Sequence, residues 1–432
     1  MKILLIQPSR LNDDGTVYHN TFRWLIGMTL PYLAGLCGSE HDIRLIDDCF
    51  QEVPYNEHWD LVGITFMSHQ TPRAFQIADE FRDRGVTVVM GGFHVSLGDT
   101  ECLEHSDAII IGEAEYTWPQ LIKDHEKGEL KKIYRSDKLH NLENLPIPRY
   151  DLLNLKKYRI KSIPVQTTRG CPWDCNYCEV TKVYGGKYRF RPLEEVVEEI
   201  KVAKTLTGRF PLYFVDDNFA VNKTRASQLM EELIRQKVSW TGLCTMHMAD
   251  DEEFLKLMKR SGCKHLNLGM ETINPDSLSS IDKRQNKIGE YKRQIHALRK
   301  SGIDFSINVM FGLDGDTAEI FNTTRDFLID NKVPTAYMFI LAPRIGTKIR
   351  DQLLAEDRIF NNDWTKYCGY EAVHYPKNMT VEELEDAFWK IHQDFYSLPS
   401  IFKRRLYSLQ SWTANLFFAW GVRKRRHPLT FY

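Results

Sequence analysis

Short apolar runs alternate with amphipathic helical patterns along most of this chain, and the alternation occurs in two separate series. Such alternation predicts βαβ units, in which each helix crosses over and packs on a parallel sheet. In the first series, strands are predicted at residues 3–6, 43–46, 61–66, 86–90 and 108–111, and helices at 22–36, 72–84, 100–105 and 117–125. In the second series, strands are predicted at 165–168, 212–215, 242–245, 265–269, 306–311 and 336–341, and helices at 193–204, 225–235, 251–261, 288–301 and 317–330. The predicted fold class is therefore α/β.

The domain organisation follows from the same pattern, since 432 residues suffice for two or three domains. Five strands with helices on both faces predict a doubly wound parallel-sheet domain at residues 1–140. The proline-bearing segment NLENLPIPRYDLLNLKKY then favours an extended linker at 141–160. Six βα units predict a partial (β/α)6 barrel at 161–345. Residues 346–432 are predicted to form a mostly helical C-terminal extension, with one helix starting after Thr380.

Charge and composition exclude several classes of protein. A net charge of −1, with 27% charged and 43% hydrophobic residues, excludes wholesale disorder and a generally nucleic-acid-coating surface. Nine cysteines, an odd and unevenly spaced set, fit a reducing compartment. The N-terminal apolar run stops at Gln7, and no stretch approaches the roughly 18 apolar residues of a membrane span. A cytoplasmic protein is predicted.

Three cysteines, Cys171, Cys175 and Cys178, follow the first predicted barrel strand with the spacing C-x3-C-x2-C. Thiolates this close in one loop favour zinc or an iron–sulfur cluster. A zinc site needs a fourth ligand, and the nearest downstream Cys and His residues belong to other βα units. Three thiolates on a four-iron cluster leave one iron open to a substrate or cofactor. We therefore predict that these cysteines bind a [4Fe-4S] cluster.

This spacing, in a loop after a strand, resembles the radical S-adenosylmethionine (SAM) superfamily. The resemblance implies that the open iron binds SAM and that an electron from the cluster cleaves it to a 5'-deoxyadenosyl radical, which takes hydrogen from a substrate carbon. It also implies SAM contacts at Tyr177, Asp216, Asp217, Glu271 and Asn308. The alternative for the residues at strand ends is that they cap the helices that follow.

A doubly wound domain ahead of such a barrel resembles the cobalamin-binding branch of that superfamily. The resemblance implies a front-domain cobalamin site that includes Thr65, Ser68, Gly91, Gly92, Gly112 and Glu113. No D-x-H-x-x-G pattern occurs, so base-off cobalamin without a histidine ligand is predicted. The alternatives are a spacer domain without a cofactor and a site for another nucleotide, although a G-x-G-x-x-G fingerprint is absent.

The function implied by this resemblance is C-methyl transfer, in which methylcobalamin delivers a methyl group after hydrogen abstraction. The predicted substrate is a small molecule, such as a lipid or natural-product intermediate, and the predicted electron donor is a flavodoxin or ferredoxin. One alternative is a cobalamin-dependent rearrangement, cyclisation or oxidation without methyl transfer. Another is a non-catalytic cobalamin sensor, which the intact cysteine trio disfavours.

The tail at residues 401–432 carries seven Lys or Arg and no Asp or Glu, a charge of +7. Between its two basic clusters lies the aromatic segment SWTANLFFAWGV. Cations beside aromatic side chains predict peripheral contact with an anionic membrane. The alternative is a core helix with a solvated basic end. Nucleic acid is disfavoured because no nucleic-acid motif accompanies the basic residues.

Overall fold

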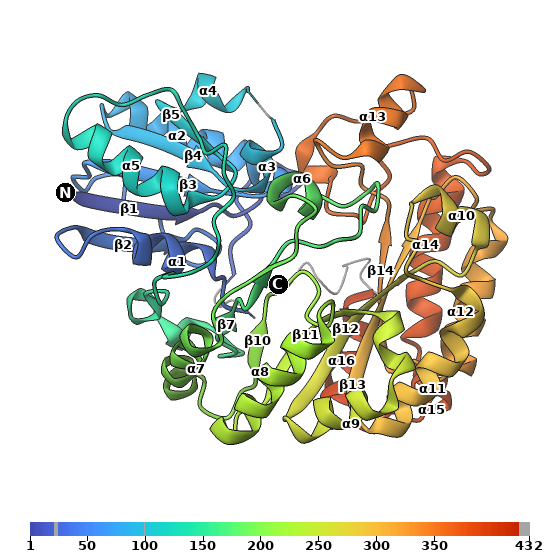
Figure 1. Cartoon of the computed structure of the whole chain (residues 1–432). Coiled ribbons are helices and arrows are strands. Elements are labelled where there is room, and N and C mark those ends of the chain that lie inside the picture. Colours follow the sequence, from blue (N-terminus) through green and yellow to red (C-terminus); the bar gives the residue numbers. More distant parts are fainter. Residues whose placement is uncertain (21–24, 99, 423–432) are drawn as a thin grey trace.

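The computed structural model describes residues 1–20, 25–98 and 100–422, and two six-stranded parallel sheets dominate this part of the chain. The first sheet has the order β2-β1-β3-β4-β5-β6 (Figure 1). Its strands are β1 (Lys2–Gln7), β2 (Asp42–Asp47), β3 (Leu61–Thr65), β4 (Thr87–Gly91), β5 (Ala108–Ile111) and β6 (Ile133–Arg135). The chain passes from β2 across β1 to β3, so the direction in which strands are added to the sheet reverses at β1. In parallel sheets, a ligand crevice forms at such a switch point, at the carboxyl ends of the strands.

Helices cover both faces of this sheet, as a doubly wound fold requires. The helices are α1 (Thr29–Leu36), α2 (Thr71–Asp83), α3 (Phe93–Ser96), α4 (Cys102–His105) and α5 (Ala114–Glu126). Side chains of α1 and α5 pack with Leu5 and Val89 on one face. Side chains of α2 and α4 pack with Leu4 and Val88 on the other. The alternating strand residues are therefore buried on both sides, which explains the continuous apolar runs in the sequence.

The five strands predicted in this region are confirmed, and the structure adds β6. This strand has only three residues, of which Ile133 and Arg135 are exposed, so it lacks the apolar run that identified the others. The helix predicted at residues 22–36 is present, but its predicted start is wrong because α1 begins at Thr29. Residues 21–24 lie outside the described residues.

The second sheet has the order β14-β13-β12-β11-β10-β7, and helices lie along its outer face as in a partial barrel (Figure 1). Its strands are β7 (Pro164–Val165), β10 (Leu212–Phe214), β11 (Trp240–Thr245), β12 (Cys263–Glu271), β13 (Asp304–Phe311) and β14 (Thr335–Ile340). Its helices are α7 (Leu193–Thr207), α8 (Lys223–Gln236), α9 (Glu252–Arg260), α10 (Pro275–Ser280), α11 (Tyr291–Ser301) and α12 (Glu319–Asp330). The six parallel strands confirm the predicted fold class.

The first barrel strand is shorter than the predicted 165–168. It ends at Val165, and the chain then forms β8 (Thr168–Arg169), which pairs antiparallel with β9 (Arg189–Phe190). The cause is Asp216, whose Oδ1 accepts hydrogen bonds from the backbone N–H groups of Thr167 at 2.6 Å and Thr168 at 2.9 Å. These donors are no longer available to a parallel neighbour. Helix α6 (Val180–Tyr184) follows the cysteine loop.

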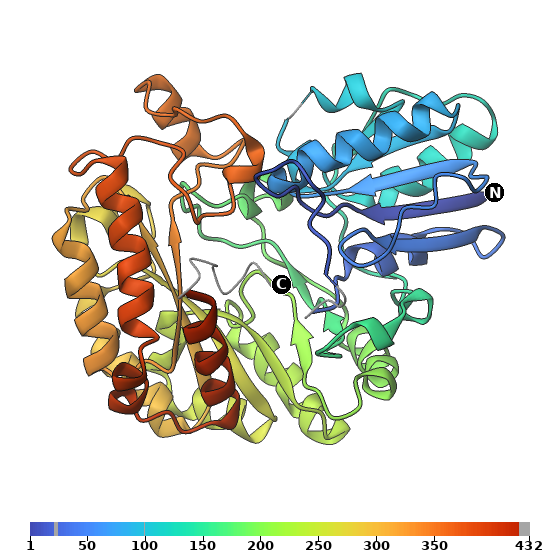
Figure 2. The same ribbon diagram turned by 180° about the vertical axis from the view of Figure 1, so that it is seen from behind.

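The C-terminal extension, as far as residue 422, contains the helices α13 (Lys348–Ala355), α14 (Val381–Phe395), α15 (Leu398–Arg404) and α16 (Leu409–Val422). Thr380 caps α14 in a capping box with Glu383, as the sequence predicted. Figure 2 shows the red C-terminal helices beside the edge of the second sheet, where α14 and α16 pack on β14. Short 3₁₀ turns lie at Ser68–Gln70, Tyr150–Leu152, Leu155–Lys157, Met246–Asp250, Ile288–Glu290 and Trp364–Lys366.

The aromatic segment of the tail forms α16, and one face of this helix belongs to the protein core. Phe418 packs against Tyr337 of β14, with ring centroids 6.0 Å apart, and Ser411 Oγ donates to Asp304 at 2.7 Å. Asn415 Nδ2 donates to the carbonyl oxygen of Pro334 at 3.0 Å. No helix among the described residues is long and apolar enough to cross a membrane.

Arg404, one of the seven basic residues of the tail, is buried and not part of a cationic surface. Its guanidinium donates to the carbonyl oxygens of Pro334 at 2.6 Å and Phe395 at 2.9 Å, and to Asn415 Oδ1 at 2.8 Å. Burial lowers the pKa of Arg404 to about 10, so the side chain stays charged at neutral pH. The guanidinium therefore connects α14, α16 and the start of β14.

We expect Arg404→Ala to lower the free energy of unfolding by about 3 kcal/mol, because it leaves several buried acceptors without a donor. Urea denaturation followed by circular dichroism measures this change. Lys403→Ala is the matched control, since the Lys403 side chain is 65% exposed and pairs with Asp330 on the surface. Equal stability of the two variants would contradict the role of Arg404 in the core.

Candidate functional site

A cavity of about 440 Å³ lies at the carboxyl edge of the first sheet, and residues of the barrel complete its wall. Its deep part is an apolar slot on the sheet face that α1 and α5 cover. The slot residues are Leu5, Gly63, Val89, Gly91, Ile110 and Trp118. Its mouth faces Arg169, Tyr184 and Asp217, which lie next to the cysteine loop or at the end of the second barrel strand. The cavity therefore connects the two sheets.

Two glycines keep the slot open. A Cβ on Gly63 would lie 2.9 Å from Leu5 Cδ2 and 3.4 Å from Trp118 Cη2. A Cβ on Gly91 would lie 3.7 Å from Ile110 Cβ, so a longer side chain there would fill the slot. An apolar slot beside a polar mouth fits cobalamin, whose slender nucleotide tail can enter the slot while the amide side chains of its corrin ring meet the polar residues. The residues present thus fit the predicted cofactor.

Five of the six residues predicted for the cobalamin site line this cavity: Thr65, Gly91, Gly92, Gly112 and Glu113. Ser68 is not among the lining residues, and its hydroxyl forms a hydrogen bond of 3.0 Å with His94 Nδ1. Gly92 has a second reason to be glycine, because its φ is +105° and a Cβ would lie 2.7 Å from the carbonyl oxygen of Phe66. The backbone therefore requires this glycine whether or not a ligand binds.

Sequence reasoning missed the residues that form the bottom of the slot. Gly63 lies in the middle of β3, and Trp118 lies on α5 and is nearly fully buried. A glycine inside a predicted strand marks a place where something approaches the backbone closely, and that signal was available at Gly63. Trp118 gives no such signal, because a tryptophan in a helical pattern fits an ordinary core equally well.

The cysteine loop starts at Gly170, whose φ of +88° and close approach to the carbonyl oxygen of Lys187 exclude a side chain. Asp217 Oδ2 accepts a hydrogen bond of 3.0 Å from the backbone N–H of Gly170. Burial raises the pKa of the Cys178 thiol to about 12 and also raises the pKa of Cys171 and Cys175. Repulsion from neighbouring cysteine thiolates contributes to the raised pKa values of Cys171 and Cys178.

The cysteine trio suits a cluster better than a single ion. Within residues 1–20, 25–98 and 100–422, no three Cys, His, Asp or Glu side chains are arranged to hold one metal ion. A four-iron cluster does not need such convergence, because each thiolate binds a different iron. Gln285 Nε2 lies 3.7 Å from Cys175 Sγ, within reach for a weak hydrogen bond to the sulfur. The donor set therefore fits the predicted cluster.

Asp216 and Asp217 have different surroundings although they are adjacent. Asp216 is completely buried and bound to the backbone of Thr167 and Thr168, where it fixes the chain that enters the cysteine loop. Burial raises the pKa of Asp216 to about 6, although its hydrogen bonds oppose this change. Asp217 lines the cavity. Of the two, only Asp217 is placed to meet a ligand in the cavity.

Glu271 and Tyr177, both predicted SAM contacts, are linked by the buried Lys283. The Lys283 ammonium forms an ion pair with Glu271 and lies 3.0 Å from the hydroxyl of Tyr177. Burial opposes the charge on Lys283, but Glu271 raises its pKa above the ordinary value. Glu271 has a φ of +69° and lies at a register shift in β12, which turns its side chain toward the cysteine loop. Asn308 lies on β13 opposite Gly269.

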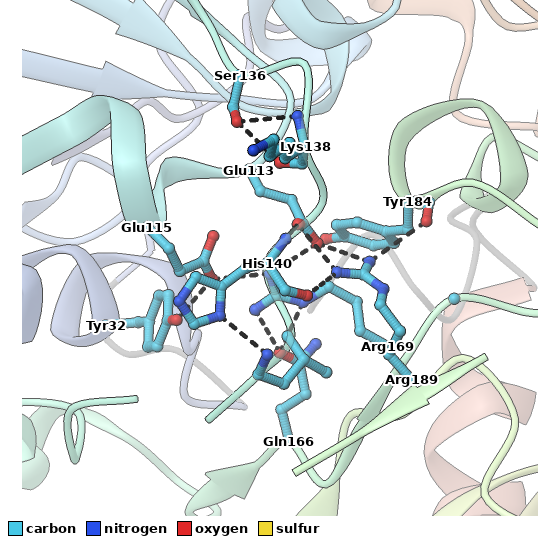
Figure 3. A network of polar contacts seen from close by, with 12 residues as sticks. Tyr32, Glu113, Glu115, Ser136, Lys138, His140, Gln166, Arg169, Tyr184 and Arg189 are labelled. Carbon is cyan, nitrogen blue, oxygen red and sulfur yellow. Dashed lines mark hydrogen bonds and ion pairs between the residues drawn. The ribbon is translucent and has the colours of Figure 1, made fainter. Parts of the chain in front are cut away.

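A buried network of charged side chains joins the first sheet to the cysteine loop (Figure 3). Glu113 directly precedes α5 and Glu115 lies in its first turn, whereas Arg169 and Arg189 come from β8 and β9. Arg169 donates to Glu113 at 3.0 Å and to Glu115 at 2.7 Å. Because Arg169 lies two residues before Cys171, the network fixes the loop relative to the cavity. The sequence did not predict this contact.

A partial α/β barrel with three cysteines in the loop after its first strand is the arrangement typical of radical SAM domains. The family model of the radical SAM superfamily matches residues 165–328 of this chain. It is 28% identical over 415 residues to the bacteriochlorophyllide d C-12(1)-methyltransferase of Chlorobaculum tepidum, an alignment that covers 93% of this chain and 89% of that enzyme.

Two solved structures share the fold. The cobalamin-dependent SAM radical enzyme OxsB, solved with aqua-cobalamin and SAM, superimposes with a TM-score of 0.70 at 15% identity and covers 99% of this chain and 72% of its own. The radical SAM methyltransferase TsrM from Kitasatospora setae, solved with cobalamin and a [4Fe-4S] cluster, gives a TM-score of 0.65 at 17% identity, covering 82% of this chain and 78% of its own. The arrangement of a doubly wound sheet before a radical SAM barrel is therefore established.

Proposed function

We propose that this protein is a cobalamin-dependent radical SAM C-methyltransferase. The observation that carries the proposal is the cavity that residues of both sheets line, whose slot fits cobalamin and whose mouth includes Arg169 and Asp217 beside the cysteine loop. The similarity to a bacteriochlorophyllide methyltransferase over almost the whole chain supports methyl transfer. When bound, the cluster and cobalamin supply reductive cleavage of SAM and delivery of a methyl group.

The residues of the chain divide into three groups in this proposal. Cys171, Cys175 and Cys178 hold the cluster. Tyr177, Asp217, Glu271 and Asn308 surround SAM, and Lys283 supplies a positive charge beside them. Thr65, Gly91, Gly92 and Gly112 contact cobalamin, together with Gly63 and Trp118. Asp216, Glu113 and Ser68 act as internal anchors, because their polar atoms already bind other groups of the protein.

Each part of the chain has its own role in this proposal. Residues 1–140 form the cobalamin-binding part, 141–160 the linker, 161–345 the radical SAM barrel and 346–432 the extension. The relative from Chlorobaculum tepidum is named as a methyltransferase that acts on bacteriochlorophyllide d. We infer a substrate of that class, a hydrophobic natural-product or lipid-like molecule, and an electron donor such as a flavodoxin or ferredoxin.

Methyl-deuterated SAM tests the proposed reaction. Anaerobically reconstituted protein with cobalamin and reductant is incubated with a candidate substrate, and the product is analysed by mass spectrometry. A deuterated methyl group on a product carbon together with 5'-deoxyadenosine supports the proposal. A converted product without the label would indicate rearrangement, cyclisation or oxidation. Failure to form 5'-deoxyadenosine would favour the cobalamin sensor.

We further propose peripheral contact with anionic membranes through an exposed apolar surface on α15 and α16. This surface comprises Phe402, Leu409, Leu416 and Trp420, whose exposed fractions are 65%, 80%, 49% and 49%. Aromatic and leucine side chains beside cations are typical of elements that lie in a lipid interface. Such contact would bring the enzyme to a lipid-soluble substrate. The contribution of Arg404 to this attraction is excluded by its burial.

We expect the protein to sediment with anionic vesicles at low salt, and the double variant Phe402→Ser/Leu409→Ser to remain largely in the supernatant. Leu354→Ser is the matched control, because Leu354 is 52% exposed on α13, outside this surface. Truncation at residue 400 is unsuitable, since it removes the buried face of α16. If the double variant binds vesicles as well as the intact protein does, this surface is not the membrane contact.

A further inference from the structure

The two glutamates of the buried network have different hydrogen-bond partners. Both carboxylate oxygens of Glu113 are occupied by the protein. Glu113 Oε1 accepts from Arg169 at 3.0 Å and from Arg189 at 2.7 Å. Its Oε2 accepts from the backbone N–H of His140 at 2.8 Å and from Arg189 at 3.0 Å. Burial opposes ionisation, but these donors lower the pKa of Glu113 below its ordinary value. Glu113 therefore has no oxygen left for a ligand.

Glu115 uses only one of its two oxygens. Glu115 Oε1 accepts from Arg169 at 2.7 Å and from the hydroxyl of Tyr32 at 2.6 Å (Figure 3). Its Oε2 is buried and has no hydrogen-bond partner in the structure. The Glu115 side chain is only 3% exposed, and the residue belongs to the cavity wall. An unpaired buried carboxylate oxygen is costly, so a hydrogen-bond donor from a ligand is the missing partner.

The charge of the network indicates what kind of donor this is. Glu113 and Glu115 face Arg169 and Arg189, so two negative and two positive side chains balance each other. A cationic ligand is not needed for neutrality, and an anionic group such as a phosphate would be repelled by the carboxylate. The matching partner is a neutral hydrogen-bond donor, such as an amide N–H. Cobalamin carries such donors around its corrin ring, as acetamide and propionamide side chains.

We propose that Glu115 anchors cobalamin by accepting a hydrogen bond from a propionamide N–H of the corrin ring through its second carboxylate oxygen. This inference rests on the proposed function and deepens it. The first oxygen of Glu115 binds Arg169, two residues before Cys171, so the same side chain connects the cofactor to the cysteine loop. Glu115 is thus a binding residue, and Arg169 is the positioning residue that transmits its placement.

Equilibrium titration of the full-length, cluster-reconstituted protein with hydroxocobalamin tests this proposal without measuring activity. In Glu115→Gln, the amide oxygen keeps the bonds from Arg169 and Tyr32, and the amide NH₂ replaces the unpaired oxygen. The glutamine NH₂ then faces the propionamide N–H, so two donors oppose each other. The dissociation constant of hydroxocobalamin should therefore rise at least roughly tenfold. Tyr32→Phe is the matched control, because it removes one hydrogen bond to Glu115 and leaves the unpaired oxygen. We expect a change of less than about threefold in this control.

A second experiment changes the ligand instead of the protein, by replacing one amide of cobalamin with a carboxylate. In cobalamin monocarboxylic acids, one propionamide is hydrolysed to a carboxylate. Wild-type protein should bind at least one of these isomers at least roughly tenfold more weakly than cobalamin, because two carboxylates then meet. Glu115→Gln should bind that same isomer more tightly than the wild type does, because its NH₂ can donate to the new carboxylate. This reversal identifies the side chain of the corrin that Glu115 contacts.

The outcomes separate this inference from the proposed function. If wild-type protein binds cobalamin but accepts all the monocarboxylic acids equally, and Glu115→Gln has unchanged affinity, the role of Glu115 is overturned while cobalamin binding stands. If wild-type protein binds no cobalamin, both proposals fail. Should Glu115→Gln not fold, the discrimination of the wild type between cobalamin and its monocarboxylic acids decides alone.

Discussion

Replacing Cys171, Cys175 and Cys178 together with alanine will abolish the visible charge-transfer absorbance of the reconstituted protein and its formation of 5'-deoxyadenosine. Thiolates are the ligands of such clusters, and these three come from one loop that Gly170 and Asp217 fix in place. Iron content should fall from about four per chain to near zero. The loss of SAM cleavage should be complete, because the reduced cluster supplies the electron that cleaves SAM.

The control is a variant with alanine at the three front-domain cysteines, Cys37, Cys49 and Cys102. These cysteines form no disulfide and lie in or near the first sheet, away from the loop. We expect this control to keep full iron content and SAM cleavage. An unchanged cluster spectrum in the loop variant would refute the assignment of the cysteine trio.

The second large effect concerns the slot. Gly91→Leu should raise the dissociation constant of cobalamin by at least roughly tenfold, because the new side chain fills the space that the nucleotide tail needs. The backbone tolerates this change, since Gly91 has no positive φ and its Cβ would make only ordinary contacts. Spectroscopic titration with hydroxocobalamin measures the affinity, and cluster content reports on the fold.

Gly289→Leu provides the matched control, because Gly289 has open space around its Cβ position and lies outside the cavity. Gly92→Leu would be a poor test, since its clash with the backbone of Phe66 disturbs the protein before any ligand is added. Wild-type affinity in a folded Gly91→Leu protein would mean that cobalamin does not enter the slot.

Local sequence patterns predicted the strands, the barrel and the cysteine loop, because apolar runs and close cysteine spacing depend on neighbouring residues. Contacts between distant residues were not predictable in this way. Asp216 fits a ligand motif at a strand end, yet its partners are Thr167 and Thr168, about 50 positions earlier. Glu113 likewise meets Arg169 and Arg189 from the small antiparallel sheet of β8 and β9. Whether a strand-end carboxylate faces a ligand or another part of the protein depends on the packing of whole domains.

The tail at residues 401–432 shows the same limit of prediction from local sequence patterns. Seven cations and an aromatic segment are equally compatible with a membrane surface and with a core helix that carries a basic end. In the structure one face of α16 is buried against β14, as the core-helix alternative predicts. The opposite side exposes Leu409 and Leu416 and is compatible with the membrane hypothesis. Only the three-dimensional arrangement assigns Arg404 to the core and Phe402 to the surface.

The early end of the first barrel strand has a consequence for how the cluster is acquired. Asp216 binds the backbone just before the loop, and Asp217 binds Gly170 at its start, so protein groups alone supply these hydrogen bonds. Ordering one backbone residue costs about 1–2 kcal/mol, and hydrogen bonds that hold residues in place reduce that cost when ligands are arranged around a metal centre. The two carboxylates thus lower the entropic cost of presenting the neighbouring cysteine thiolates to iron.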